Sequence, residues 1–437
     1  MVSKNATRDG GSRSAVVVGG GIGGLTAAVA LRQVGWRVTV LERAARFGEI
    51  GAGITLLSNG LRCLDAIGLG DAVRGGGLPM VATGMRTAAG RWLSRIDGDG
   101  TDLEARMGTT TLTIHRAELH KILRDALPAE SLVPGVTTTG IDGGADGGPT
   151  ELRFRHRDKD ALLRADLVVG ADGVNSWVRA RRWPDAPAPV YSGTTTWRAV
   201  TTSSPAAVTE MSLSWGQGTE FGVMPLLDGR TYWYAAANAG EAQRNPDELA
   251  ELRRRFGTWH EPIPAVLAHT QPQAVLRHDI YRLPKLDRYY RGSVVLLGDA
   301  AHAMTPNLGQ GGGQALEDAI VLAAAVSRAS DVATALARYD HERRARTQAM
   351  ALAATRQLRF GQQLQNPIAV KLRNTAVALT PDRIALLALA RYGKWFPPAL
   401  DNADDRGLSR PDAPLAERLS DACQGDTPPA QRAGRCR

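Results

Sequence analysis

Three glycine-rich turns, each directly after a short apolar run, hold the residues of this sequence best suited to chemistry. The first turn, residues 19–24, reads GGGIGG and satisfies the pattern G-x-G-x-x-G through Gly19, Gly21 and Gly24. Glycines at this spacing allow a tight turn and a close backbone approach to a pyrophosphate, and the helix that follows points free N–H groups at the phosphates. The first turn therefore predicts a dinucleotide site.

An acidic side chain follows at the place where the ribose of such a dinucleotide would lie. Glu42 comes 18 positions after Gly24, at the end of the next apolar run, and a carboxylate there accepts hydrogen bonds from ribose hydroxyls. This favours FAD or NAD over a 2′-phosphorylated dinucleotide. The alternative is a glycine-rich loop beside an exposed glutamate.

The second and third turns each combine glycine with aspartate. Residues 170–179 read GADGVNSWVR, and residues 298–313 read GDAAHAMTPNLGQGGG. Asp299 can accept hydrogen bonds from polyol hydroxyls, and the glycines after Pro306 let main-chain N–H groups and a helix dipole face a ring edge that becomes negative on reduction. His302 is expected to pack or cap locally rather than to act as a base.

In order and spacing the three turns resemble the fingerprints of class A flavoprotein monooxygenases of the para-hydroxybenzoate hydroxylase fold, most of all the salicylate hydroxylase, urate hydroxylase and zeaxanthin epoxidase branch. The likeness covers residues 14–346, and residues 115–119, HRAEL, are similar to an arginine-bearing segment that touches the flavin in that family. A plain surface arginine is the alternative for Arg116. The FAD-binding residues that the turns and the resemblance imply are Gly19, Gly21, Gly24, Glu42, Arg43, Gly53, Arg116, Asp172, Gly173, Asp299, Pro306, Gly309, Gly311 and Gly312.

The resemblance also implies a reaction. NADPH or NADH reduces FAD, O2 adds to give a C4a-hydroperoxide, and an aromatic or polycyclic small molecule is hydroxylated or epoxidised. The cofactor supplies the electron and oxygen chemistry, while the protein orients the substrate and excludes water. The alternatives are a flavin-dependent dehydrogenase or reductase that inserts no oxygen, and a flavin-binding redox protein without catalysis.

The elements that must position the turns form one nucleotide-binding sheet. Residues 15–18, 165–169 and 293–297 are continuous apolar runs typical of buried parallel strands. The alanine-rich helix 25–34 and the strand 37–41 complete a βαβ unit. Helices are predicted after Gly311 through Arg346, then over 350–379 and 382–395.

Between the second and third turns the sequence changes to short strands. Residues 209–215, 220–227 and 231–237 are β-prone, Asp228-Gly229 is a strong hairpin signal, and residues 84–96 form a further strand or hairpin. We therefore expect an α/β fold: a Rossmann-type FAD-binding domain with an inserted antiparallel β-sheet substrate domain and C-terminal helices. The expected boundaries are 14–80, 105–185 and 285–350 for the FAD-binding domain, 81–104 and 186–284 for the substrate domain, 351–400 for the helices and 401–437 for a disordered tail.

The inserted sheet is expected to cover the flavin ring and to line the substrate pocket. Because side chains alternate along a strand, Met211, Leu213 and Trp215 share one face, and Tyr232 and Tyr234 share another. A plain sheet core is the alternative for most of these side chains. The predicted substrate-binding residues are Trp197, Met211, Trp215, Phe221, Met224 and Tyr234.

Arg198 and Tyr232 are the catalytic candidates. Some relatives that hydroxylate phenols hold the substrate as a phenolate with an arginine on this strand and a tyrosine on a later one. A fixed guanidinium favours the phenolate by charge pairing, and the phenolate is the better nucleophile. The alternative for Arg198 is a structural ion pair.

Composition restricts the classes of function. A chain of 437 residues with 43% hydrophobic and 22% charged side chains suits a globular protein of two or three domains. The net charge is +9, but no basic block is interleaved with aromatics, which argues against nucleic-acid binding. The field suits an anionic nicotinamide cofactor or an acidic substrate.

Cysteine content and apolar runs bear on the compartment. Cys63, Cys423 and Cys436 give neither a disulfide framework nor a metal site, and at Cys63 a buried apolar role is favoured over covalent flavin attachment. No apolar run reaches the ~20 residues of a transmembrane helix, and no signal peptide is visible. We expect a cytoplasmic protein that binds an aromatic substrate, O2 and NAD(P)H but no metal, and a homodimer is compatible with the sequence.

Overall fold

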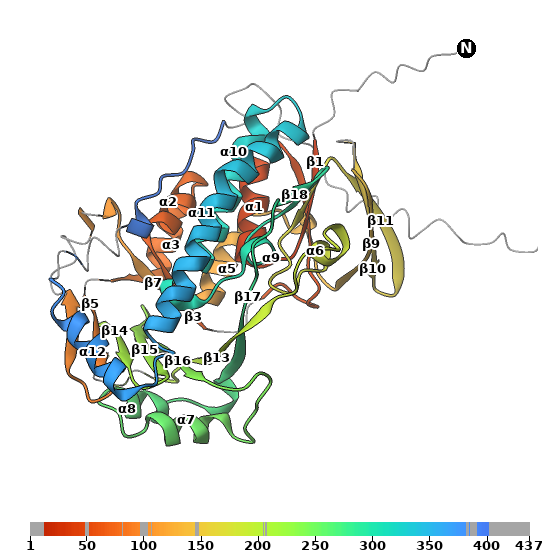
Figure 1. The fold of residues 1–437 in the computed structure, drawn as a ribbon. Helices are drawn as coiled ribbons and strands as arrows, with labels where there is room; N and C mark the ends of the chain where they lie inside the picture. The colour runs from red at the N-terminus through yellow and green to blue at the C-terminus, as the bar shows by residue number, and fades with distance from the viewer. Residues whose placement is uncertain are drawn as a thin grey trace, which may run out of the picture.

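A six-stranded sheet organises the nucleotide-binding part of the molecule in the computed structural model (Figure 1). The structure describes residues 13–48, 52–80, 82–96, 104–105, 107–144, 148–203, 205, 208–381, 384 and 391–401. The sheet is parallel except for its first edge strand. Its strands in spatial order are β18 (Tyr290–Arg291), β19 (Val294–Leu296), β12 (Leu167–Gly170), β1 (Ser14–Val18), β2 (Arg37–Leu41) and β8 (Leu132–Val133).

The three distant apolar runs of the sequence are neighbours in this sheet, as predicted. β1 lies between β12 and β2, and β19 pairs with β12. Parallel strands end at one edge, so the turns after β1, β12 and β19 lie along the same edge of the sheet. The predicted α/β fold class is confirmed.

Helix α1 (Ile22–Gln33) packs closely against α10 (Gly311–Arg328), which Figure 1 shows lying side by side. The contact is close because one partner has no side chain: a Cβ at Gly23 would lie 3.0 Å from the Cβ of Ala315. Residues 25–31 of α1 are all buried, as a helix between a sheet and a second helix requires.

A seven-stranded sheet forms the inserted part, with β17, β13, β16, β15, β14, β5 and β6 in that order. The hairpin at Asp228-Gly229 is confirmed, because the N–H of Leu226 donates to the carbonyl of Arg230 at 2.9 Å. The antiparallel prediction fails for one pair, since β5 runs parallel to β14. The bounds are β5 (Thr83–Thr87), β6 (Trp92–Ile96), β13 (Val190–Val200), β14 (Met211–Trp215), β15 (Thr219–Pro225), β16 (Thr231–Asn238) and β17 (Leu276–Arg282).

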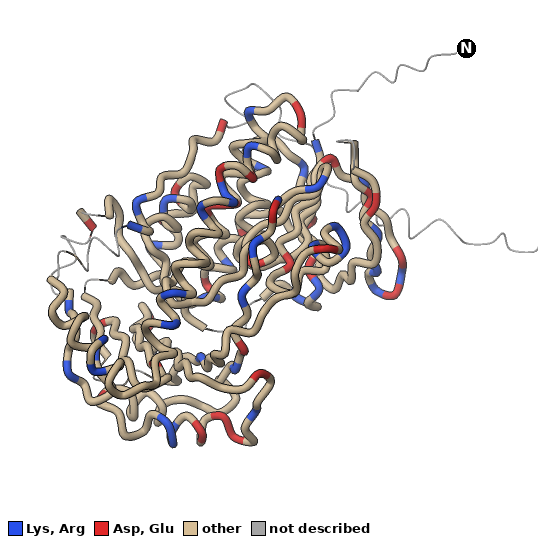
Figure 2. Tube along the Cα trace, in the orientation of Figure 1, with Lys and Arg blue, Asp and Glu red and all other residues tan. Residues whose placement is uncertain are grey.

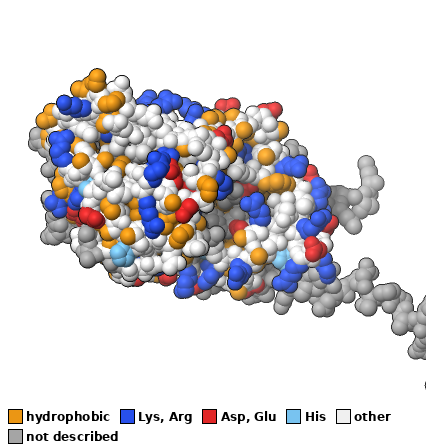
Figure 3. Space-filling model, turned by 90° about the horizontal axis from the view of Figure 1, so that it is seen from below, with side chains coloured by type: hydrophobic (Ala, Val, Ile, Leu, Met, Phe, Trp, Pro, Cys, Tyr) orange, Lys and Arg blue, Asp and Glu red, His pale blue; other side chains and the backbone are white. Residues whose placement is uncertain are grey.

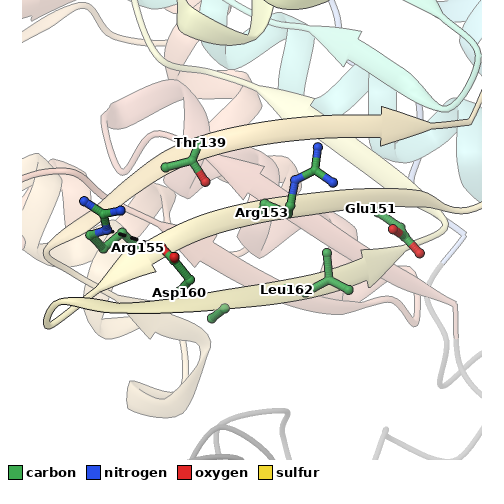
Figure 4. A pocket seen from close by; sticks show the side chains of 7 residues that line it. Thr139, Glu151, Arg153, Arg155, Asp160 and Leu162 are labelled. Atoms are coloured by element: carbon green, nitrogen blue, oxygen red, sulfur yellow. Dashed lines mark hydrogen bonds and ion pairs between the residues drawn. The ribbon is translucent and has the colours of Figure 1, made fainter.

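Two small sheets complete the fold. One contains β3 (Gly53–Leu56), β7 (Leu112–His115) and β4 (Gly77–Pro79), and the other contains β11 (Lys159–Ala165), β10 (Thr150–His156) and β9 (Val136–Gly143). Figure 4 shows a pocket on the second sheet, lined by Thr139, Glu151, Arg153, Arg155, Asp160, Ala161 and Leu162. None of the predicted cofactor or substrate residues lines it, so this pocket is not the candidate site.

The C-terminal helices differ from the prediction in where they break. α10 ends at Arg328, and α11 (Val332–Phe360) runs without interruption through residues 346–350. The break falls here because Asp331 caps α11, accepting from the N–H of Thr334 at 2.8 Å. The last described helix is α12 (Pro367–Ala378). Most of the predicted helix 382–395 and nearly all of the tail 401–437, with Cys423 and Cys436, lie outside the described residues.

The remaining helices are short. They are α2 (Ser58–Ala66), α3 (Gly70–Gly76), α5 (Arg116–Asp125), α6 (Trp177–Arg182), α7 (Glu248–Phe256), α8 (Ile263–Ala268) and α9 (Asp299–His302), with 3-10 turns η1 (Ala129–Ser131), η2 (Pro272–Ala274) and η3 (Pro306–Leu308). Over the ranges given above, none of the helices is long and apolar enough to cross a membrane, and no group of His, Cys, Asp and Glu side chains is arranged to hold a metal ion.

Candidate active site

The turn between β1 and α1 is built so tightly that only glycine fits. Gly19 has a φ of +111°, and a Cβ at Gly24 would lie 2.0 Å from the carbonyl oxygen of Gly19. Gly21 behaves differently, because a Cβ there would meet nothing within 4 Å. Gly19 and Gly24 therefore shape the turn, while Gly21 borders open space that a phosphate group could enter.

Glu42 is fixed at the end of β2 by this same turn. Its carboxylate accepts from the N–H of Gly20 at 2.7 Å and from the N–H of Ala44 at 2.8 Å. Each carboxylate oxygen has a second acceptor direction, so both remain able to bind ribose hydroxyls. Arg43 follows Glu42 directly and is exposed.

Helices α1, α9 and α10 begin in the glycine-rich turns without a side-chain cap. Their N-cap residues are Gly21, Gly298 and Gln310. Helices α2, α3 and α8 also lack such a cap, whereas α5, α6, α7, α11 and α12 are each capped by a side chain. Uncapped first turns present N–H groups and a positive dipole end. An anionic ligand such as a pyrophosphate or a reduced flavin edge satisfies both features.

The second and third turns also border open space. A Cβ added at Gly173, Gly309 or Gly311 would meet nothing within 4 Å, and Gly309 has a φ of +62°. Beside them, three buried oxygens have no hydrogen-bond partner among the described residues: Asp172 Oδ1, Thr305 Oγ1 and Asn307 Oδ1. Free acceptors next to glycine-lined space fit a long, polar, hydroxyl-bearing ligand such as FAD.

Asp172 and Asp299 carry the carboxylates of these turns. The other oxygen of Asp172 accepts from the N–H of Val178 at 3.0 Å and so fixes the start of α6. Solvent reaches the side chain of Asp299, yet desolvation by the surrounding protein raises the pKa of its carboxyl, against the opposing effects of His302 and Arg116. A carboxyl that solvent reaches, although the surrounding protein desolvates it, lies at the wall of an enclosed space. A ribityl chain in that space would need such an acceptor.

A buried ion network holds the third turn in place. Arg343 on α11, with 1% of its side chain exposed, donates to Glu317 at 2.5 Å and to Asp318 at 2.6 Å, both on α10. The second oxygen of Asp318 contacts Nε2 of His302 at 2.6 Å and accepts from the N–H of Gly298 at 2.9 Å. Burial alone would raise the pKa of Asp318, but His302 and Arg343 lower it to about 2.

His302 thus has a structural role in this network, in accord with the sequence prediction. Glu317 extends the network to α2, since it also accepts from Asn59 at 2.7 Å and from Arg346 at 2.7 Å. Asn59 in turn donates to Gln310, the residue before α10, at 3.0 Å. The loop that carries the predicted flavin contacts is therefore fixed from three helices.

The inserted sheet turns one face toward the predicted flavin segment. Ala52 packs in a single apolar cluster with Val200, Met224 and Tyr232. Tyr232 lies directly against Gly53, where a Cβ would come within 2.3 Å of the tyrosine ring. Gly51, which precedes this segment, lies outside the described residues, and Gly312 packs on Ile54, whose side chain a Cβ at Gly312 would meet at 2.9 Å.

The catalytic candidates Arg198 and Tyr232 lie on this inner face, in a positively charged environment. Arg198 Nη2 is 3.4 Å from Nδ1 of His278 on β17, and Arg198 Nε is buried without a hydrogen-bond partner. Burial raises the pKa of Tyr232, while Arg198 and Arg116 counteract the rise. Burial, followed by repulsion from Arg198, lowers the pKa of Arg116, and Asp299 and Tyr232 oppose that shift. The four side chains thus act on one another across the space between the sheet and the third turn.

Two of the predicted substrate residues lie on the wrong face of the sheet. Trp197 and Phe221 are 2% and 1% exposed and pack with Trp233 beneath α7 and α8. Trp197 precedes Arg198 on β13, and neighbours on a strand point to opposite faces, so the two cannot both face the flavin segment. We withdraw the prediction that Trp197 and Phe221 contact the substrate.

The prediction that the tyrosines lie on a different face from Met211 is also wrong. Met211, Met224, Tyr232 and Tyr234 pack in the same cluster as Ala52. Strand pairing explains the result: Tyr234 is opposite Arg198 in the β13–β16 register, and Met224 is opposite Tyr232 in the β15–β16 register. Directly opposed residues in a sheet share a face.

Glu220 was not among the predicted residues, yet it organises the far end of this face. It is 5% exposed and accepts from Trp215 Nε1 at 2.6 Å and from the hydroxyl of Tyr234. Burial raises the pKa of this carboxyl, against the opposing effect of both hydrogen bonds and Arg373. Trp215 and Tyr234 are therefore held by a buried acid rather than left free to adapt.

Three residues of the site escaped the sequence reasoning for different reasons. Arg343 has partners 25 and 26 residues away, and Glu220 joins Trp215 to Tyr234 across two strands, which no local pattern shows. His278 lies two residues after Leu276 on β17 and so shares its face, and a strand prediction for residues 276–282 would have placed it on the inner face.

Cys63 is fully buried in the core, and burial raises the pKa of its thiol, as expected for an apolar role.

Known proteins resemble this chain over most of its length. The family described as FAD binding domain matches residues 13–354. The aurachin C monooxygenase/isomerase of Stigmatella aurantiaca is 40% identical over 326 residues, which cover 74% of this chain and 83% of that protein. The 3-amino-4-hydroxybenzoate 2-monooxygenase of Streptomyces cremeus is 36% identical over 320 residues, covering 70% and 76%. The crystal structure of HpxO from Klebsiella pneumoniae with FAD and uric acid has a TM-score of 0.79 at 28% identity and covers 87% of this chain and 96% of that one.

Gly24 and Gly21 are expected to fail in different ways when replaced by alanine. Gly24→Ala forces the Gly19 backbone to move and should destabilise the protein by about 1–3 kcal/mol. Gly21→Ala has room for its methyl group, so the ligand-free protein should keep its stability while losing affinity for FAD. Chemical denaturation without flavin and a fluorescence titration with FAD separate the two effects, and equal stability of both variants would contradict the assignment.

Removing the buried cation should unfold the network around the third turn. Arg343→Met leaves Glu317 and Asp318 buried without their partner and should cost about 3–5 kcal/mol of unfolding free energy. Arg344→Met is the control, because the Arg344 side chain is 38% exposed and pairs with Asp340 one turn away on the same helix, a pair worth about 1 kcal/mol or less. Denaturant titrations of the two variants measure their unfolding free energies, and similar midpoints would contradict a central role for Arg343.

Proposed function

The chain belongs to the FAD-binding-domain family of flavin-dependent monooxygenases, and from this premise we propose which residues hold FAD and what kind of substrate the enzyme hydroxylates. The single observation that carries the proposal is the position of Arg198 and Tyr232 on the face of the inserted sheet that packs against Ala52 and Gly53. When bound, FAD would supply the redox and oxygen-transfer chemistry that the side chains alone cannot, with NADPH or NADH and O2 as co-substrates.

We assign the adenosine and pyrophosphate to the first turn. Gly21 and the N-terminus of α1 receive the phosphates, and Glu42 accepts from the ribose, with Arg43 beside it. Asp299 and Asp172 accept from the ribityl hydroxyls and neighbouring polar groups, and the residues from Pro306 to Gly312 surround the ring edge. The same assignment makes residues 14–80, 105–185 and 285–350 the FAD-binding domain, and 81–104 and 186–284 the substrate domain.

The substrate that this site suits best is an aromatic ring with an ionisable hydroxyl or ring N–H group. Arg198 and Arg116 make the inner face electropositive. Burial, followed by repulsion from Arg198 and Arg116, lowers the pKa of His278, so this imidazole is neutral near pH 7. Asp299 is assigned to the ribityl chain, and Asp279 on β17 is bonded to Thr195 and Arg277. A positive environment lowers the pKa of a phenol and stabilises its anion. Two relatives support this class, since their names give urate and 3-amino-4-hydroxybenzoate as substrates.

Each inner-face residue has a defined task in this proposal. Arg198 pairs with the substrate anion, and Tyr232, whose hydroxyl has no hydrogen-bond partner within the described ranges and whose pKa is raised by burial, donates a hydrogen bond to it. Met211 and Met224 contact the apolar part of the ring, and Trp215 and Tyr234 close the far end of the site through Glu220. A buried sheet face also keeps water away from the reacting atoms, which limits wasteful consumption of NAD(P)H.

Oxygen labelling tests the reaction itself. Purified protein loaded with FAD should consume NADPH or NADH several-fold faster when a suitable phenol or heteroaromatic is added, and the product should carry one labelled atom when the gas is 18O2. The measurement is cofactor absorbance followed by mass spectrometry. Product that forms without label would assign the chain to the dehydrogenase or reductase alternative instead.

Substitutions at Arg198 test the substrate assignment. Arg198→Met removes a charge-assisted contact worth roughly 1.5–3 kcal/mol and should raise KM by roughly 10- to 100-fold, with FAD affinity unchanged. Arg198→Lys keeps the charge and should recover part of the loss. Steady-state kinetics over a pH series provide the measurement, because a phenol that ionises unaided at high pH should reduce the difference between variant and parent. A KM that does not respond to Arg198→Met would refute the assignment.

A further inference from the structure

An apolar stripe runs along the exposed face of α12. Ile368, Leu372 and Leu379 are 72%, 67% and 76% exposed. The helical repeat places Ile368 and Leu372 one turn apart on the same face, and Leu379 continues that line just beyond the helix. The buried side of α12 is occupied by Val370 and Arg373, so the stripe is the side that the fold leaves without a partner.

The end of α11 adjoins α12, because Arg373 donates to the carbonyl of Gly361, the residue directly after α11. Leu352 and Phe360 are also exposed large apolar side chains, and Arg356, Arg359 and Lys371 are exposed cations among them. None of these three cations makes an ion pair with a described residue. Figure 3 shows hydrophobic and basic side chains side by side at the end of the molecule that α12 occupies. We call these residues the α12 patch: Leu352, Arg356, Arg359, Phe360, Ile368, Lys371, Leu372 and Leu379.

The charge around the α12 patch has one sign. Residues 343–381 contain no aspartate or glutamate but seven arginines and lysines, and the trace of α12 in Figure 2 carries blue without red. A helix lying in a membrane interface has this composition, with apolar side chains on one face and long cations around them that reach the anionic headgroups. Each such cation contributes about 1 kcal/mol of attraction to an anionic surface.

We propose that the α12 patch binds the surface of an anionic lipid bilayer. A second copy of the chain suits the patch less well, because a two-fold interface opposes the patch to itself and would bring like charges together. The charges of residues 402–437 give this segment no net attraction to the α12 patch, since it carries six acidic and six basic side chains. An anionic lipid surface alone matches both the apolar stripe and the unopposed cations.

The patch is linked to the substrate site by direct contacts. Arg373, on the buried face of α12, lies 4.7 Å from the centre of the Trp215 ring and donates to the carbonyl of Gly361 at 2.6 Å. Trp215 and Tyr234 then meet at Glu220. Lipid bound at α12 would thus lie next to the sheet that lines the site, although the membrane proposal does not depend on which substrate the enzyme takes.

Vesicle flotation with the full-length, FAD-loaded protein tests the proposal. The protein should float with phosphatidylcholine vesicles that contain phosphatidylglycerol, should bind pure phosphatidylcholine far less, and should be released by salt. Leu372→Glu and Lys371→Glu should each weaken binding by roughly tenfold or more. The matched controls are Leu227→Glu, at a 53% exposed leucine on the β15–β16 turn, and Lys159→Glu, at an exposed lysine on β11, and both should bind like the parent.

The outcomes separate this proposal from the proposed function. All four variants change exposed side chains, so they should keep their melting temperature and their NAD(P)H oxidation with a water-soluble substrate. If the parent protein binds anionic and neutral vesicles equally, or binds neither, the membrane proposal is wrong while the monooxygenase assignment stands. Light scattering that shows a dimer lost in Leu372→Glu, or vesicle binding that appears only after residues 402–437 are removed, would also overturn it in favour of a second copy or the tail.

Discussion

The buried charge of Arg343 is the constraint on which the rest of the structure depends. A guanidinium without solvent must have its partners in fixed positions, and here the partners are Glu317 and Asp318 on α10. Asp318 then fixes His302 and the Gly298 backbone, and Glu317 fixes Asn59 on α2. One cation therefore sets the register of α10 against α11 and positions the turn that carries Asp299. The loop to which we assign the flavin ring edge is thus held by hydrogen bonds that all lead back to this one cation.

Much of the fold could be predicted from the sequence, because the signals involved are local. The runs 15–18, 165–169 and 293–297 are mostly apolar, and the glycines at 19 and 24 fit a tight turn, so the parallel sheet and its first turn follow from local patterns. The two failures differ in kind. The helix break at Asp331 depends on a local cap, since Asp331 accepts from the N–H of Thr334 three residues later, and the prediction overlooked this signal. The parallel β5–β14 pair joins strands more than 120 residues apart, which no local pattern shows.

Within the site, the predictions for neighbouring residues depend on which face of the strand each side chain takes. Composition places Trp197 and Arg198 equally well on the inner face, but a strand can turn only one of two neighbours inward. Trp197 faces away from residues 52–53 and donates to Glu248, at the start of α7, at 2.8 Å, so its neighbour Arg198 takes the inner face. Arg198, Arg116 and His278 lie on three elements that are remote in sequence, and no motif connects them.

The contact between Gly53 and Tyr232 brings β3 and the inserted sheet together at close range. A Cβ at position 53 would lie 2.3 Å from the tyrosine ring and 2.7 Å from the Cβ of Tyr232. Loss of the ring alone would make no room, because every residue except glycine at position 232 keeps that β-carbon. A larger residue at 53 would require the backbones of the two segments to move apart, so the missing side chain of Gly53 sets how closely the inserted sheet can approach.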